Sequence, residues 1–109
     1  MKEEFNVIEI RHRKILVKGV GKLFYQEGYP ISMAVSEFKK RGVEVSLLHV
    51  ADECLKNGWS AKTTISKLKE DFKDDIDGNV FNIYELELFC ESSYETQREM
   101  IFNYLFTSK

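Results

Sequence analysis

The residues of this chain best suited to bind another molecule are the lysines and hydroxyl side chains of the stretch 58–72, GWSAKTTISKLKEDF. Lysine neutralises phosphate charge, and serine and threonine form short hydrogen bonds to phosphates or base edges. In a helix these side chains share a face opposite to an apolar stripe that begins at Ala61 and continues to Phe72. The pattern predicts a nucleic-acid-binding face made of Lys62, Thr63, Ser66, Lys67 and Lys69.

Two amphipathic helices must position this face. The spacing of apolar residues predicts a helix over 47–57, which Ser46 caps and Gly58 ends. Ser60 caps the helix that carries the lysines, and that helix ends near Lys73 because the aspartates there oppose the helix dipole. Two such helices joined by a glycine turn are typical of a helix-turn-helix, whose second helix enters the major groove of DNA.

The start of the second helix resembles a known family. Gly58-Trp59-Ser60-Ala61-Lys62-Thr63 is similar to the W-S-x-K-T opening of the recognition helix in winged-helix repressors of the penicillinase-repressor type. In that family this helix contacts operator DNA and the protein acts as a dimer. The resemblance spans about residues 46–69. It implies a homodimeric transcription regulator in which Lys62 and Thr63 contact duplex DNA. After this helix the chain departs from the family, because aspartates replace the basic helix terminus and the segment 73–76 is too short for a wing strand.

The remaining sequence predicts strands and two further helices. Residues 5–11 and 14–20 alternate and are rich in β-branched residues, so we expect a hairpin around His12-Arg13, with its second strand continuing over 22–26. Residues 80–91, VFNIYELELFCE, also alternate and predict a long strand.

Helices are expected over 31–41 and 93–106, the second with a capping box of Ser92 and Glu95, and 43–45 is expected to be an extended link. The predicted fold is α+β, a single domain over 1–109 in the order β-β-α-α-α-β-α. It has an N-terminal hairpin, three helices that include the helix-turn-helix-like pair, one long strand that joins the sheet, and a C-terminal helix.

The charge distribution leaves a second function class open. Residues 1–50 carry nine Lys and Arg against six Asp and Glu, whereas residues 51–109 carry seven against twelve. A negative half, an excess of aromatic residues and a last helix that is apolar over much of its girth indicate a small acidic protein-interaction module. Such an adaptor or inhibitor, from a phage or plasmid, would bind a basic surface of a host protein. Its predicted contact residues are Glu85, Glu87, Phe89, Phe102 and Phe106.

The other reactive side chains do not form a catalytic or metal-binding pattern. GVGK at 19–22 lacks the spacing of a phosphate-binding loop. His49 shares a polar helix face with Asp52 and Glu53, but the chain has two histidines and no zinc-site spacing of His and Cys. The sequence also shows no nucleophile–base pair and no dinucleotide glycine pattern. We therefore expect no enzyme activity, no metal and no cofactor.

Cellular location and redox state follow from the same sequence. The amino terminus, MKEEFNVIEI, has no basic segment followed by an apolar one, and no apolar run approaches the ~20 residues of a membrane span. We expect a cytoplasmic protein without a membrane partner. Cys54 and Cys90 lie in apolar contexts, which predicts buried, reduced thiols, although a disulfide between them stays open.

Overall fold

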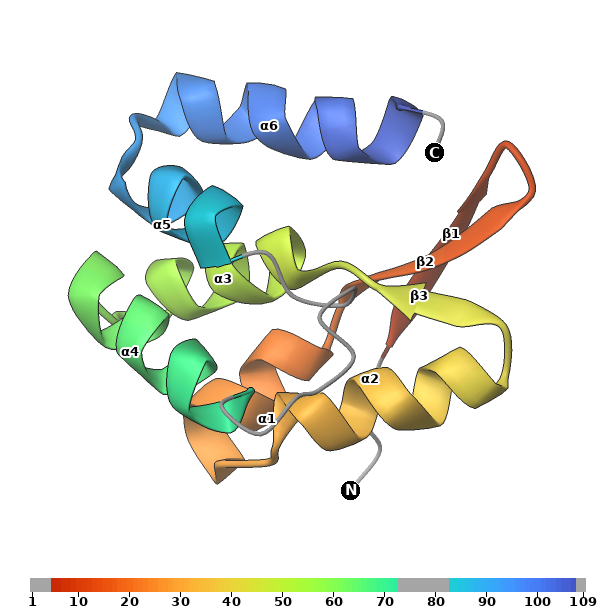
Figure 1. The fold of residues 1–109 in the computed structure, drawn as a ribbon, viewed down its shortest axis with the longest axis horizontal. Coiled ribbons are helices and arrows are strands. Elements are labelled where there is room, and N and C mark those ends of the chain that lie inside the picture. The colour runs from red at the N-terminus through yellow and green to blue at the C-terminus, as the bar shows by residue number, and fades with distance from the viewer. Residues whose placement is uncertain (1–4, 73–82, 108–109) are drawn as a thin grey trace.

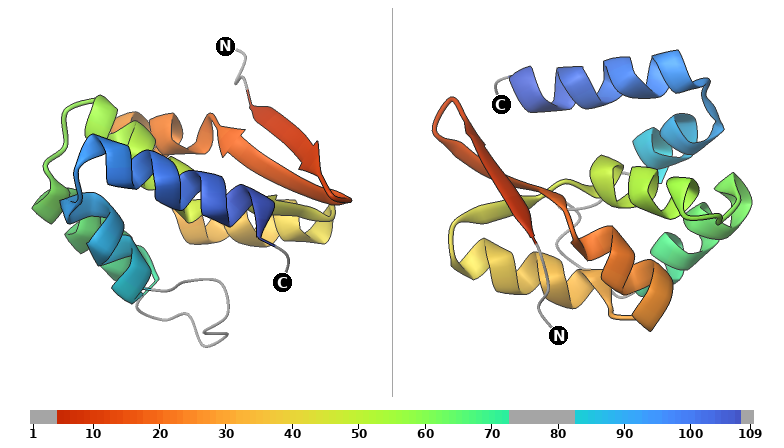
Figure 2. Two further views of the ribbon diagram at one scale, coloured as in Figure 1. Left: turned by 90° about the horizontal axis from the view of Figure 1, so that it is seen from above. Right: turned by 180° about the vertical axis from the view of Figure 1, so that it is seen from behind.

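The computed structural model describes residues 5–72 and 83–107 (Figure 1). Within these ranges the chain is α+β, as predicted, in the order β-β-α-α-β-α-α-α-α. The sheet lies at one end of the molecule between α2 and the end of α6, and α1, α3, α4 and α5 gather at the other end (Figures 1 and 2). The elements are β1 (Asn6–Ile10), β2 (Arg13–Lys18), α1 (Val20–Glu27), α2 (Ile31–Lys40), β3 (Val43–Val45), α3 (Leu47–Lys56), α4 (Ala61–Asp71), α5 (Ile83–Glu91) and α6 (Tyr94–Phe106).

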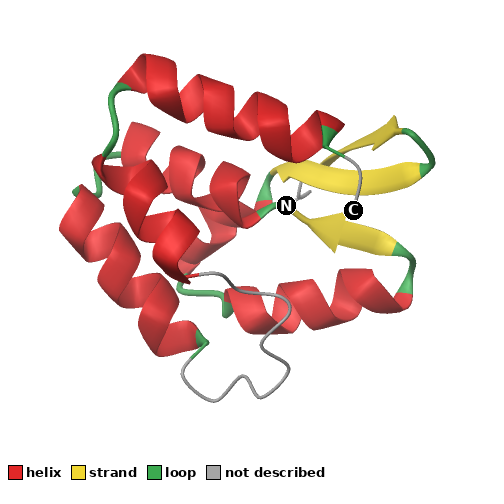
Figure 3. Cartoon of the chain, turned by 45° about the horizontal axis from the view of Figure 1, so that its top comes forward, coloured by secondary structure: helices red, strands yellow, loops and turns green. Residues whose placement is uncertain are grey.

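The sheet contains the predicted hairpin and one strand that was expected to be a link (Figure 3). β1 and β2 pair antiparallel, and their turn falls at Arg11 and His12, which have the positive φ values that a two-residue hairpin turn requires. The residues 43–45 form β3, which pairs parallel with β2. β2 is therefore the central strand, which explains why its Ile15 and Leu16 are buried.

The strand predicted to continue over 22–26 is wrong, because these residues belong to helix α1. Val20 and Phe24 lie one helical turn apart and are both buried. The amino end of α1 is capped by a carboxylate from α3: the Gly19 N–H donates to Glu53 Oε2 at 3.0 Å, and the Gly21 N–H donates to Glu53 Oε1 at 2.8 Å. A carboxylate at this position also interacts favourably with the helix dipole. No local sequence signal announces a cap that comes from more than 30 residues away.

The long strand predicted over 80–91 is also wrong, since Ile83–Glu91 is the helix α5, and residues 80–82 lie outside the described ranges. Helical spacing buries Leu86, Phe89 and Cys90 on one side and leaves Leu88 59% exposed on the other. Phe89, predicted to contact a partner protein, is 0% exposed. The alternation of apolar and acidic residues here is typical of a strand, whereas the buried Leu86, Phe89 and Cys90 have the i, i+3, i+4 spacing of a helix.

The bounds of α2, α3 and α4 agree with those predicted from the sequence to within one or two residues. Ser46 and Ser60 cap α3 and α4 by accepting the N–H groups of His49 and Thr63. The predicted capping box of Ser92 and Glu95 is wrong, because the cap of α6 is Ser93, which accepts the Thr96 N–H at 3.3 Å. Ser92 instead donates to the Leu88 carbonyl at the end of α5.

The close approach of Glu53 to α1 predicts an unusual effect of a glycine substitution. In an open helix, Gly→Ala stabilises by about 1 kcal/mol. At Gly21 an added Cβ would overlap the Glu53 side chain, which α1 needs as its cap. We therefore expect Gly21→Ala to lower the free energy of unfolding by about 1–3 kcal/mol, measured by urea denaturation.

Glu53→Gln is a second variant that tests the same contact from the other side, since it keeps the shape of the side chain and removes its charge. It should cost about 1–2 kcal/mol through weaker hydrogen bonds to the two amides. A Gly21→Ala protein as stable as the parent would show that Glu53 does not pack on α1.

Candidate nucleic-acid interface

The helix pair α3–α4 is formed as predicted, with a tight turn over residues 57–60. Gly58 takes a φ of 113°, and the N–H groups of Gly58 and Trp59 donate to the carbonyls of Leu55 and Cys54 at the end of α3. Gly58 thus adopts a backbone conformation that other residues reach only with strain, and the turn closes without a longer loop.

The buried residues of α4 determine which of its side chains face outward. Thr64, Ile65, Leu68 and Phe72 are buried. The Thr64 hydroxyl donates to the Ser60 carbonyl at 2.9 Å, so this buried polar group has a partner. The opposite side of α4 faces outward at the edge of the molecule (Figure 2). Four of the five predicted nucleic-acid-binding residues are exposed there, namely Lys62, Ser66, Lys67 and Lys69. The fifth, Thr63, is half-buried.

Two of these five residues already have partners within the chain. The Thr63 N–H donates to the Ser60 hydroxyl at 3.1 Å, and its own hydroxyl oxygen accepts from Ser60 at the same distance. Lys69 pairs with Glu87 of α5 at 3.2 Å. Lys62 and Lys67 have no ion-pair partner among residues 5–72 and 83–107. The open part of the predicted face is therefore Lys62, Ser66 and Lys67.

Asp71, at the end of α4, does not neutralise these lysines. Its carboxylate accepts the Ser32 N–H at 2.9 Å and the Ser32 hydroxyl at 3.1 Å, so it caps the amino end of α2. Glu70 is exposed on the outer side of α4. Lys73, Asp74 and Asp75 lie outside the described residues.

Four basic residues of the hairpin and of α2 do not extend the face of α4. Arg11 and Arg13 belong to the hairpin, and Lys39 and Lys40 belong to the last turn of α2. The hairpin and the end of α2 lie on the opposite side of the molecule from α4 (Figures 1 and 2). These four cations are therefore not expected to join a phosphate contact made by α4.

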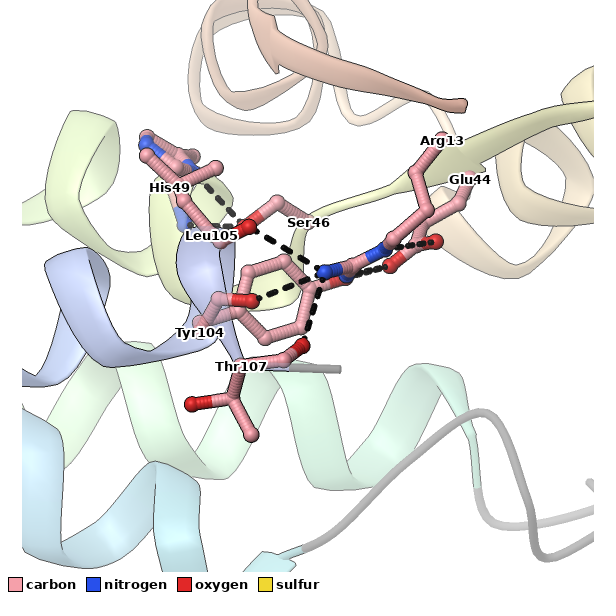
Figure 4. A network of polar contacts seen from close by, with 7 residues as sticks. All are labelled: Arg13, Glu44, Ser46, His49, Tyr104, Leu105 and Thr107. Carbon is pink, nitrogen blue, oxygen red and sulfur yellow. Dashed lines mark hydrogen bonds and ion pairs between the residues drawn. The ribbon is translucent and has the colours of Figure 1, made fainter. Parts of the chain in front are cut away.

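Arg13 forms a clasp between the sheet and the end of α6 (Figure 4). Its Nη2 pairs with Glu44 Oε2 at 2.5 Å, and the Tyr104 hydroxyl donates to the same oxygen at 2.6 Å. Nη1 donates to the carbonyl oxygens of Tyr104, Leu105 and Thr107, each at 3.2 Å. The hydrogen bond from Arg13 to Glu44 raises the pKa of Arg13, and burial raises the pKa of Tyr104. The charged guanidinium of Arg13 is thus bound by partners within the chain.

The structure brings together one serine–histidine pair, which the sequence analysis did not identify. Ser46 Oγ lies 2.6 Å from His49 Nδ1 (Figure 4). Ser46 is 0% exposed, and its Oγ also accepts the His49 N–H at 3.4 Å. The pair is a serine N-cap with an added side-chain contact and not a reciprocal capping box, because the Ser46 N–H donates to the Leu16 carbonyl at 3.2 Å. A buried hydroxyl that caps a helix is not positioned to attack a substrate.

The cysteines agree with the prediction of buried, reduced thiols. Cys54 and Cys90 are both free and buried. Burial raises the pKa of Cys54 to about 12 and that of Cys90 to about 11, so both thiols are protonated at neutral pH.

In the described part of the chain, no group of three or more His, Cys, Asp or Glu side chains could hold a metal ion. No helix among the same residues has the length and apolar character needed to cross a bilayer.

The predicted protein-interaction residues do not lie on one surface. Phe89 is in the core, so this part of the prediction is wrong. Glu87 is paired with Lys69, and Glu85 is exposed on α5. Phe102 and Phe106, in contrast, are exposed together on α6. Glu95 and Glu99 are also exposed on α6, and the sequence-based prediction did not include them.

Comparison with protein-family models, curated proteins and solved structures gives no match for this chain. The likeness of residues 46–69 to penicillinase-repressor-type proteins stays a prediction from a short motif.

The half-buried position of His49 predicts a pH dependence of stability. Burial lowers the pKa of His49, whereas in the unfolded chain it takes up a proton near its ordinary value of 6.5. As the pH falls through 6.5 the unfolded state binds more protons than the folded state, so the free energy of unfolding decreases. His49→Gln keeps a hydrogen-bonding side chain at this position of the cap and should make that decrease smaller.

The measurement is urea denaturation between about pH 7 and pH 5. His12→Asn serves as control, because His12 is exposed in the hairpin turn and asparagine tolerates a positive φ. This variant should retain the decrease of the parent protein. An identical pH profile for His49→Gln and the parent would contradict a depressed pKa at His49.

Proposed function

We propose that this protein is a small regulatory protein that binds duplex DNA through the outer face of α4. One observation carries the proposal: Lys62, Ser66 and Lys67 project outward from the second helix of a tightly turned helix pair. A helix fits into the major groove, and residues at its amino-terminal end meet base edges and phosphates there.

Each open side chain of α4 has a distinct role in this proposal. Lys62 and Lys67 neutralise phosphates on the two borders of the groove, and the Ser66 hydroxyl hydrogen-bonds a phosphate or a base edge. Asp71 supports the arrangement because its carboxylate is engaged by α2 and does not compete with DNA for the lysines. With only two unpaired lysines on the face, binding by one molecule is expected to be weak and strongly dependent on salt.

The proposal predicts how two alanine substitutions change the salt dependence. The probe is a fluorescein-labelled duplex of about 20 base pairs, titrated by anisotropy between about 50 and 200 mM salt. Each lysine–phosphate contact contributes about 0.9 to the slope of log affinity against log salt. Lys62→Ala and Lys67→Ala should each lower that slope by about one and weaken binding at low salt.

Lys40→Ala is the matched control, since Lys40 is exposed in the last turn of α2, and that end of α2 lies away from α4 (Figure 1). It should leave the slope unchanged. Absence of binding at the lowest salt concentration would refute the proposal, and so would an equal loss of slope in the control.

Breaking the ion pair of Lys69 should increase the salt dependence of DNA binding. Glu87→Gln removes the charge that holds Lys69 at 3.2 Å from α5 and frees its ammonium group for a phosphate. The same titration should then show a slope steeper by about one and tighter binding at low salt. An unchanged slope would place Lys69 outside the DNA-binding face.

A further inference from the structure

α6 is a helix of 13 residues in which no side chain is fully buried. Its inner side, with Met100, Ile101 and Tyr104, packs on the core. Its outer side is apolar as well, because Phe102 is 60% and Phe106 40% exposed. The two rings lie against each other with their centroids 4.6 Å apart. A helix that is apolar on two sides is expected to bury both of them.

The outer side of α6 combines these rings with acidic residues. Glu95 and Glu99 are exposed in its first half, and Phe102 and Phe106 follow in its second half. In a helix these four positions share one face, because their spacing is +4, +3 and +4. The outer side of α6 points away from the rest of the molecule in two opposite views (Figures 1 and 2). The face is therefore an acidic segment that continues into an aromatic one.

Charge decides which kind of molecule fits this face. The described part of α5 and α6 carries five glutamates and a single cation, Arg98, whose guanidinium donates to the Tyr94 hydroxyl at 3.1 Å. A two-fold pair with parallel α6 helices would bring like charges together, which costs several kcal/mol, and an antiparallel pair would set Glu95 and Glu99 of one copy against the rings of the other and not against cations. The basic face of α4 from a second copy fits no better, since α4 exposes no large apolar side chain to cover the rings. Nucleic acid is repelled by the same carboxylates.

We propose that the outer face of α6 binds a basic amphipathic helix of a partner protein. Apolar side chains of the partner cover Phe102 and Phe106, and lysines or arginines meet Glu95 and Glu99. Exposed aromatic anchors of this kind supply much of the binding energy at interfaces, and the carboxylates select a cationic partner. This surface does not depend on DNA binding by α4, because α3 and α5 lie between α4 and α6 (Figure 1).

The test uses a defined probe and its charge-inverted counterpart. The probe is an acetylated and amidated peptide of about 18 residues made of Leu and Lys, with leucines at i, i+3, i+4 and i+7. The counterpart has Glu at every Lys position. Isothermal titration calorimetry with the full chain should detect binding of the Lys peptide and none of the Glu peptide.

Two independent variants locate the binding surface. Phe102→Ala with Phe106→Ala should weaken binding at least about tenfold, and Glu95→Gln with Glu99→Gln should weaken it and reduce its salt dependence. The matched control combines Met33→Ala with Glu27→Gln, which are exposed on α2 and α1 away from α6. The control should bind like the parent. Since all four changed residues of α6 are exposed, the variants should fold, which circular dichroism checks.

Three outcomes would overturn the proposal. The first is equal binding of the Lys and Glu peptides, or binding of neither. The second is unchanged binding in both α6 variants. The third is a concentration-dependent dimer in sedimentation velocity that disappears in the Phe102→Ala, Phe106→Ala protein, because the face would then belong to a second copy. None of these results bears on the DNA titrations, which probe lysines on a different helix.

Discussion

Two carboxylates hold the helices of this protein in place, and the rest of the arrangement depends on them. Glu53 of α3 caps α1, and Asp71 of α4 caps α2. Each joins the central helix pair to an earlier helix through amides that would otherwise lack partners. The same contacts direct acidic charge inward at two helix amino termini. The outer side of α4 thus keeps unpaired lysines in a chain whose net charge is −2.

Local signals in the sequence predict those elements that interactions between neighbouring residues determine. Serine caps, glycine stops and apolar periodicity place α3 and α4 correctly, and with them the exposure of Lys62 and Lys67. They fail where distant partners decide. β3 is a strand because β2 lies beside it, and α1 is a helix with a cap from α3. In α5, acidic and apolar residues alternate as in a strand, and only the burial of Leu86 and Phe89 selects the helix.

The candidate binding residues of α4 and α6 also differ in whether local sequence signals identify them. The exposure of Lys62, Ser66 and Lys67 follows from one helix and its cap, so the sequence is sufficient to predict it. The surface of α6 depends on knowing which side of the helix rests on the core, and the sequence does not show this because both sides are apolar. Arg13 looks like a cation available to a ligand, but Glu44 and three carbonyl oxygens of the chain occupy it.

The clasp of Arg13 also has a consequence for the order in which the protein assembles. Arg13 and the carbonyl of Tyr104 are 91 positions apart in the sequence. During synthesis on the ribosome, the hairpin leaves the exit tunnel long before its last partners exist. Contacts of such long range form late because closing the loop costs entropy first. The docking of α6 onto the sheet is therefore expected to be a late event in folding, after the helices α1 to α4 have packed together.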